Sequence, residues 1–243
     1  MLVDFPPAFG GARYVRKRCE CEELEYQTVL ARYTGYADRC RAQRYFDAST
    51  LGQRFMSKTF EQFTPNAQTS VALRKSKQFV LQALHGEASV RVAGLLFIGP
   101  VGTGKSHLAA AIYNELKNNG KNCVFISVPD LLDRLKASYS SDALGREADV
   151  LEVIKQCELL VLDDVGAERH TGEEDWASER LFAIFDHRYR NMLPTIGTTN
   201  CQPNILEDKL GARTMSRLRE MCELVPCLGN DYRKTKAVAG KND

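Results

Sequence analysis

Long apolar runs are absent from this sequence of 243 residues. A membrane-spanning helix needs about 18 or more consecutive apolar residues, and the longest apolar runs here, residues 94–98 and 159–162, have the length of a strand. Near the amino terminus, Asp4, Pro6 and Pro7 stand where a secretory signal has a basic stretch followed by an apolar one. We therefore expect a cytoplasmic protein without a membrane span.

An excess of charge of one sign is also lacking, because 33 Lys and Arg residues stand against 31 Asp and Glu residues. A net charge of +2 does not by itself mark a nucleic-acid binder. Glycine and proline are scarce, at 17 and 8 residues, which excludes a collagen-like or low-complexity chain. The length suits one large core with a small accessory region.

Cysteine is plentiful, but a complete set of metal ligands is lacking. A tetrahedral structural zinc site takes four ligands, and Cys19, Cys21 and Cys40 have no histidine near them, because the first one is His85. Without a secretory signal, the 8 cysteines are expected to be reduced thiols rather than a disulfide framework. Zinc at Cys19, Cys21 and Cys40 is the less favoured alternative to free thiols.

The patterns of apolar residues divide the chain into two parts. Residues 20–53 carry apolar and aromatic residues at helical spacing, which predicts a helical N-terminal region of residues 1–58. Turn residues at 57–66 predict a linker or docking loop. Residues 59–243 alternate helices with strands, which predicts a parallel sheet with helices on both faces. The expected helices cover residues 67–86, 105–118, 129–138, 146–157 and 174–191, and the expected strands cover residues 92–98, 123–128, 158–163 and 195–199.

The first of these strands runs directly into the sequence GPVGTGKS at residues 99–106, and a helix follows. This satisfies the G-x-x-x-x-G-K-[ST] pattern in the strand–loop–helix context that it requires. The glycines let backbone N–H groups surround a β-phosphate, and the start of the helix adds partial positive charge. We expect Lys105 to reach the β- and γ-phosphate oxygens and Ser106 to bind Mg²⁺. The residues expected to bind ATP are Gly99, Pro100, Val101, Gly102, Thr103, Gly104, Lys105, Ser106 and His107.

Two adjacent acids, Asp163 and Asp164, follow the apolar strand at 158–163. Unpaired carboxylates are costly at the end of a buried strand, so this pair indicates a function. We expect Asp163 to hold Mg²⁺ through its water shell and Asp164 to polarise a water for in-line attack on the γ-phosphate. Asn200 ends the strand at 195–199, and its amide suits the orientation of that water. Together with the phosphate loop, these residues predict ATP hydrolysis.

With these motifs the chain resembles AAA+ ATPases, and more narrowly the DnaC/DnaI-type replicative helicase loaders of bacteria and phages. The resemblance covers residues 59–234 and rests on residues 94–109, 128–132, 162–168 and 210–218. It implies an α/β P-loop NTPase fold with a five-stranded parallel sheet in the order 5-1-4-3-2, flanked by helices. It also implies Asn200 as sensor 1, Arg217 as an arginine finger for a neighbouring subunit, and Arg233 as a sensor-2-like residue.

The resemblance further implies an ATP-dependent loader that places a hexameric DnaB-type helicase on single-stranded DNA during replication initiation. Residues 1–58 would contact the helicase, the ATPase domain of residues 59–243 would contact single-stranded DNA, and the finger would join copies of the chain. Arg134, Lys136 and Arg146 are candidates for the DNA contact, although a solvated helix face explains these charges equally well.

Other functions fit the same motifs. A transposition helper of the IstB type shares the ATPase core and acts on duplex DNA, but residues 59–63 and 213–222 favour the loader. An ATP-gated binding module with little hydrolysis is a second alternative, because Asp164 stands where many AAA+ proteins have the longer Glu. A small-molecule kinase would need an acceptor-binding lid, which we do not recognise in the sequence.

Overall fold

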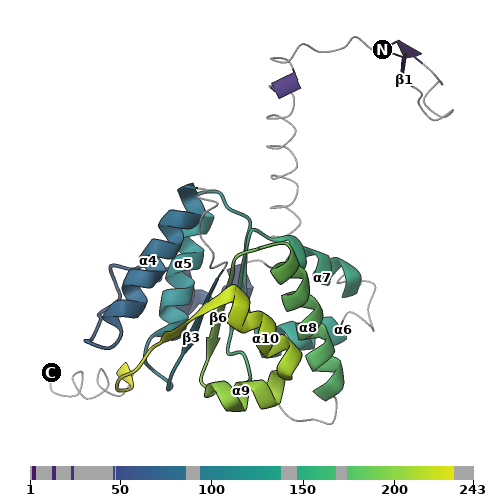
Figure 1. The fold of residues 1–243 in the computed structure, drawn as a ribbon. Helices are drawn as coiled ribbons and strands as arrows, with labels where there is room; N and C mark the ends of the chain where they lie inside the picture. The colour runs from purple at the N-terminus through teal and green to yellow at the C-terminus, as the bar shows by residue number, and fades with distance from the viewer. Residues whose placement is uncertain are drawn as a thin grey trace. The chain divides into compact units, whose positions relative to one another are not determined.

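The computed structural model describes residues 2–3, 13–14, 23–24, 46, 48–85, 94–137, 147–167 and 174–232 (Figure 1). Contacts divide the chain into two units, residues 1–37 and residues 38–243. In the first unit, β1 (Leu2–Val3) pairs antiparallel with β2 (Arg13–Tyr14). Most of the helix expected over residues 20–53 lies outside the described residues. No helix in the described part of the chain is both long and apolar enough to cross a membrane.

The second unit is built on a five-stranded parallel sheet, which confirms the expected fold class. Numbered along the chain, its strands lie in the order 2-3-4-1-5, which is the predicted order 5-1-4-3-2 counted from the opposite edge. Their order across the sheet is β4 (Cys123–Ser127), β5 (Leu159–Asp163), β6 (Thr195–Thr199), β3 (Gly94–Ile98) and β7 (Cys222–Pro226).

Helices cover both faces of this sheet (Figure 1). Successive strand residues point to opposite faces, so Leu95 and Phe97 enter one core while Leu96 enters the other. The first core is covered by α4 (Ser70–His85) and α5 (Lys105–Asn118). The second is covered by α6 (Val128–Ala137), α7 (Glu147–Gln156), α8 (Glu174–Arg190), α9 (Pro203–Leu210) and α10 (Ala212–Met221).

The elements that follow Thr199 were not predicted from the pattern of apolar residues. α9 and α10 are separated by a single residue, Gly211, which has a φ of 79°. A single glycine is a weak sign of a turn, so the boundary between the two helices was missed. β7 begins directly after α10, and its sequence CELVP is interrupted by Glu223, so it carries no continuous apolar run that would predict a buried strand. Its pairing with β3 is set by the tertiary fold, and only the family resemblance implied a fifth strand.

The parallel register brings the carboxyl ends of β3, β5 and β6 to one edge of the sheet. Ile98 pairs with Thr199, and Leu162 pairs with Gly197. The loop after Ile98 and the acids at the end of β5 therefore meet at this edge, where parallel α/β sheets bind their ligands.

The short helices α2 (Ala48–Leu51) and α3 (Gln53–Met56) pack against the edge strand β4. The Thr50 hydroxyl donates a hydrogen bond to the Phe125 carbonyl at 2.8 Å, and the rings of Phe55 and Phe125 stack with centroids 6.2 Å apart. Residues 48–58 thus lie in the unit that holds the sheet, although we assigned them to the N-terminal region. The functional boundary between residues 58 and 59 stays a prediction.

Arg188 of α8 is fully buried and joins three elements. Its Nε donates to the Thr195 hydroxyl at 2.9 Å, at the start of β6. Its Nη1 donates to the carbonyls of Ile154 at 2.9 Å and Cys157 at 3.0 Å, at the end of α7, and its Nη2 donates to the Pro194 carbonyl at 2.5 Å. Because these carbonyls are at the ends of elements, where regular backbone partners run out, one guanidinium supplies a hydrogen-bond donor to each of them.

We expect Arg188→Met to lower the free energy of unfolding by about 3 kcal/mol, because buried carbonyls lose their donors. Arg190→Met is the matched control, since Arg190 lies two residues away and pairs with Asp186 at the surface; its cost should be about 0.5 kcal/mol or less. Denaturant unfolding of both variants measures the difference. Equal costs would contradict the role of Arg188 as a structural cross-link.

Candidate functional site

The phosphate loop, residues 99–106, connects β3 to α5 and depends on glycine at positions with left-handed backbone. Gly102 and Gly104 have φ of 77° and 94°. A Cβ on Gly104 would lie 2.5 Å from Cε2 of Phe63, and one on Gly102 would lie 1.8 Å from Oδ1 of Asp231. Glycine is therefore required here both by the backbone conformation and by the neighbours that press on the loop.

Lys105 begins α5 and is buried, although it is charged. Its Nζ donates to the Pro100 carbonyl at 2.6 Å, and the Thr103 hydroxyl donates to the same carbonyl at 3.0 Å. The ammonium group thus lies within the curl of the loop, at the positive end of the α5 dipole. This combination of N–H groups, a lysine and a helix N-terminus is suited to bind a phosphate chain.

Asp163 ends β5 and is buried beside Thr198 of β6, whose hydroxyl donates to Asp163 Oδ1 at 2.5 Å. Burial raises the pKa of Asp163, while hydrogen bonds from Thr198 and Ser106 oppose that rise. Asp163 and Ser106 therefore lie within hydrogen-bond reach of each other beside Lys105. A carboxylate and a hydroxyl in contact supply the oxygen ligands that Mg²⁺ takes in phosphate sites, so these residues fit that ion.

Asp164 follows in a left-handed conformation, with φ of 56°. This conformation is uncommon for a residue with a side chain, and strain of this kind clusters at functional sites. The Asp164 backbone N–H donates to the Thr198 hydroxyl at 3.0 Å, which fixes the turn. The Asn200 amide nitrogen lies 3.5 Å from Asp164 Oδ1. The structure thus brings the amide and the second acid together, as the sequence predicts.

Residues 57–66, which we interpreted as a linker or docking loop, form a wall of the site together with the preceding helix α3. We call the two together, residues 53–66, the strap. The Asn114 side chain of α5 donates to the carbonyls of Phe55 at 3.0 Å and Lys58 at 2.9 Å. His107 Nε2–H donates to the Thr59 carbonyl at 2.8 Å, and burial lowers the pKa of His107, which favours the neutral ring. The strap is therefore fastened to the helix that begins at the phosphate loop.

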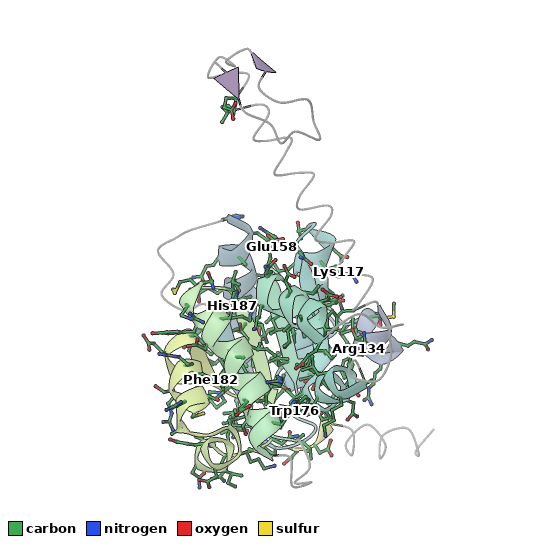
Figure 2. The ribbon with its side chains drawn as sticks, turned by 90° about the vertical axis from the view of Figure 1, so that its right-hand side faces the viewer. Lys117, Arg134, Glu158, Trp176, Phe182 and His187 are labelled. Atoms are coloured by element: carbon green, nitrogen blue, oxygen red, sulfur yellow. The ribbon has the colours of Figure 1, made fainter. Side chains whose placement is uncertain are left out.

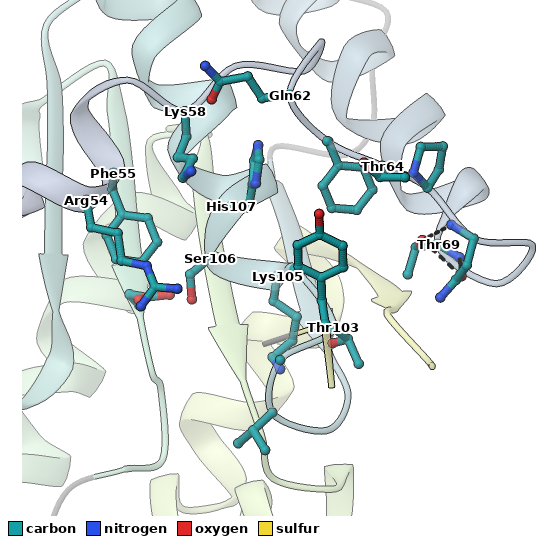
Figure 3. A pocket seen from close by; sticks show the side chains of 18 of the residues that line it. Arg54, Phe55, Lys58, Gln62, Thr64, Thr69, Thr103, Lys105, Ser106 and His107 are labelled. Carbon is teal, nitrogen blue, oxygen red and sulfur yellow. Dashed lines mark hydrogen bonds between the residues drawn. The ribbon is translucent and has the colours of Figure 1, made fainter. Parts of the chain in front are cut away.

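Between the strap and the phosphate loop lies a cavity of about 1040 Å³. In the view of Figure 3, Lys105, Ser106 and His107 lie between Phe55 and Thr64 of the strap. Asp163, Asp164 and Asn200 also line the cavity, so it joins the sites predicted separately from the sequence. The lining residues that we did not predict include Arg54, Phe55, Lys58, Gln62, Phe63, Asn66 and Tyr232.

The segment after β7 closes another side of the phosphate loop. The Cys227 backbone N–H donates to the Ile98 carbonyl at 2.8 Å, and the Tyr232 backbone N–H donates to the Gly102 carbonyl at 3.1 Å. Arg233, the predicted sensor-2-like residue, lies outside the described residues. Its neighbour Tyr232 lines the cavity, so the chain leads toward the phosphate loop at this point.

Arg217 of α10 does not line this cavity. Its Nε lies 3.3 Å from Asp186 Oδ1, and its guanidinium lies 4.4 Å from the ring centroid of Tyr189. Both partners belong to α8, on the face of the sheet opposite α5. The structure therefore brings Lys105, Ser106, Asp163, Asp164 and Asn200 together and places Arg217 elsewhere on the same chain.

The remaining candidates lie apart from the cavity or outside the described residues. Arg134 lies on the same face as Trp176 in Figure 2, and its guanidinium is 5.3 Å from the ring centroid of Phe46. Lys136 Nζ lies 5.4 Å from the ring centroid of Trp176. The other candidates, Cys19, Cys21, Cys40 and Arg146, lie outside the described residues. Within the described ranges, no group of three or more His, Cys, Asp or Glu residues forms a metal cluster.

Comparison with known proteins agrees with this geometry. The model of the family of IstB-like ATP binding proteins matches residues 14–239. The replicative helicase loader DnaC of Escherichia coli K12 is 31% identical over 180 residues, which are 74% of this chain and 70% of that protein. The crystal structure of the DnaC helicase loader superposes with a TM-score of 0.62 at 29% identity, over 73% of this chain and all of that chain. The crystal structure of DnaI has a TM-score of 0.60 at 27% identity, over 74% of this chain and 92% of that one.

We expect Asn114→Asp to loosen the strap, because the new carboxylate cannot donate to the carbonyls of Phe55 and Lys58. The free energy of unfolding should fall by about 2 kcal/mol, and trypsin should cleave after Arg54 and Lys58 faster than in the unmodified chain. Asn119→Asp is the matched control, because this substitution adds the same negative charge at the exposed end of α5. Among the described residues, the Asn119 amide donates only to Glu115, so the strap loses no hydrogen bond. A strap cleaved equally fast in both variants would refute its attachment through Asn114.

Proposed function

Because the chain belongs to the family of IstB-like ATP binding proteins, with the DnaC-type helicase loaders, we propose that it loads a hexameric DnaB-type helicase onto single-stranded DNA, using Mg²⁺-dependent ATP hydrolysis. The observation that carries this proposal is the cavity at the carboxyl edge of the sheet. Lys105, Ser106, Asp163, Asp164 and Asn200 all line it, together with the strap. These five residues supply the lysine, the metal-binding oxygens, the acid and the amide that phosphoryl transfer to water uses.

In this mechanism the backbone N–H groups of the phosphate loop and the Lys105 ammonium bind the β- and γ-phosphates. Ser106 and Asp163 would hold Mg²⁺, which neutralises charge that develops on the phosphate oxygens. Asp164 accepts a hydrogen bond from the attacking water, and Asn200 orients that water against the γ-phosphate. The contact between Asp164 and Asn200, at 3.5 Å, supports this division of roles.

Arg217 is proposed to act on the site of a neighbouring copy of the chain. Its position on α10, away from its own cavity, supports a role across an interface. An arginine supplied in this way stabilises the transition-state charge, so hydrolysis would depend on assembly. Arg233 would supply a second positive charge from within the same chain, since the preceding Tyr232 lines the cavity.

The proposed partners, a helicase and single-stranded DNA, are inferred from the family to which the chain belongs and not from contacts within this structure. We propose that residues 1–58 bind the helicase and that the ATPase domain, residues 59–243, binds the single strand. The candidates for contacts with the DNA backbone remain Arg134, Lys136 and Arg146. Basic side chains bind the phosphates of a single strand without regard to its base sequence.

The proposed roles predict different defects in two variants. Lys105→Ala should raise the Kd for ATP about a hundredfold or more, because it removes the charged ligand of the phosphates. Arg217→Ala should keep the Kd and lower the stimulated turnover about a thousandfold. Equilibrium ATP binding and steady-state hydrolysis separate the two effects, and an equal loss of binding in both variants would contradict the role of Arg217 in a neighbouring site.

ATP hydrolysis should rise when single-stranded DNA and the cognate replicative helicase are added to the pure protein. Phosphate release is measured for the protein alone, with single strands, with duplex DNA and with helicase, beside an Asp164→Ala control. Stimulation by duplex DNA alone would favour a transposition helper of the IstB type. Tight ATP binding without turnover under any condition would show an ATP-gated binding module instead.

A further inference from the structure

Arg217 is held by side chains of the neighbouring helix α8 on the outer face of the second unit. Its guanidinium lies 4.4 Å from the centroid of the Tyr189 ring, within the range of a cation–π contact. Its Nε lies 3.3 Å from Oδ1 of Asp186, one turn earlier on the same helix. The next arginine of α10, Arg219, pairs instead with Glu207 of α9 at 2.8 Å.

The charged groups around this contact form one cluster. Asp186 also pairs with Arg190 through its other oxygen, at 2.8 Å. The hydrogen bond to Glu220 raises the pKa of the Tyr189 hydroxyl, whereas the charge of Arg217 opposes that rise. On the buried side of α8, Arg188 fixes the helix to α7 and β6 through its hydrogen bonds. The end of α8, which carries Asp186 and Tyr189, is therefore fixed to the core through Arg188.

Asp186 contacts the guanidinium through Nε, and a guanidinium has further N–H donors with which to bind a phosphate. The central carbon of the guanidinium lies over the Tyr189 ring, and Asp186 contacts its Nε. The Nη groups are the donors that bind a phosphate in a bidentate manner. A long side chain that is ordered before assembly also loses less conformational entropy when it reaches a ligand.

We propose that Tyr189 and Asp186 are positioning residues that hold Arg217 ready for the γ-phosphate bound by a neighbouring copy of the chain. This inference rests on the proposed function, in which Arg217 acts across an interface. It goes beyond that function by assigning two residues of α8, which carry no ATP-binding motif, to the hydrolysis reaction of another subunit.

A mixture of two defective proteins tests the assignment. Asp164→Asn subunits cannot activate water but still present Arg217, whereas Arg217→Ala subunits keep their own site and lack the finger. Equimolar mixing should restore ATP hydrolysis in the presence of Mg²⁺ and a single-stranded oligonucleotide. Tyr189→Leu is then added to one partner at a time, with Tyr189→Phe as the conservative variant that keeps the ring face.

We expect Tyr189→Leu in the Asp164→Asn partner to lower the kcat of the mixture about three- to tenfold, with an unchanged KM for ATP. The same change in the Arg217→Ala partner should have no effect, because that subunit presents no finger. Tyr189→Phe should retain the activity on either side, and Asp186→Asn in the Asp164→Asn partner should lower kcat as Tyr189→Leu does. Arg219→Ala in the same partner is the matched control and should leave the activity unchanged.

The outcomes separate this inference from the function on which it rests. Equal losses from Tyr189→Leu on both sides would show a structural role for the ring, and no loss on either side would show no role; each overturns the inference alone. If the unmodified protein hydrolyses ATP but the mixture does not, the finger does not act between subunits, and the inference is overturned with it. If the unmodified protein does not hydrolyse ATP under any condition, the proposed ATPase function itself fails.

Discussion

The Thr198 hydroxyl, at the end of β6, is the contact on which the geometry of the site depends. It donates to Asp163 Oδ1 at 2.5 Å and accepts the backbone N–H of Asp164 at 3.0 Å. One hydroxyl therefore fixes the direction of the first carboxylate and the left-handed turn that presents the second. Because β6 lies between β3 and β5, the same strand also sets the distance from the phosphate loop to both acids. Asn200, two residues after Thr198, reaches Asp164 from this strand end.

The strap lines the cavity together with the phosphate loop, and its attachment explains why Gly104 of that loop has no room for a side chain. Asn114 and His107 of α5 hold the backbone of the strap, and the Phe63 ring lies 2.5 Å from the place that a Cβ on Gly104 would take. The same helix thus carries Lys105 of the phosphate loop at its beginning and is bonded to the strap through His107 and Asn114. Residues of the strap and of the phosphate loop line the same cavity.

The helices α8 and α10, on the face of the sheet opposite α5, carry two arginines with different surroundings. Arg188 fixes the end of α8 by hydrogen bonds to carbonyls in the core, and Asp186 and Tyr189 on that helix contact Arg217 of α10. Two arginines on neighbouring helices therefore have opposite environments. The buried one, Arg188, cross-links elements of the core, and the partly exposed one, Arg217, is the residue that we propose to act on a second subunit.

The sequence by itself determined the parts of this protein that depend on local patterns. The phosphate loop between a strand and a helix, the acids at the end of β5, Asn200 and the alternation of helices with strands could all be predicted, because each is a short segment with its own spacing or polarity. The tertiary structure decided the strap as a wall of the site, the pairing of β7 with β3, the cross-link by Arg188 and the surroundings of Arg217. These features join residues that lie far apart in the chain, such as Asn114 with Phe55 or Arg188 with Ile154. Such contacts produce no periodic pattern in the sequence. Which residue meets a buried donor or an aromatic ring depends on how the helices and strands pack in three dimensions.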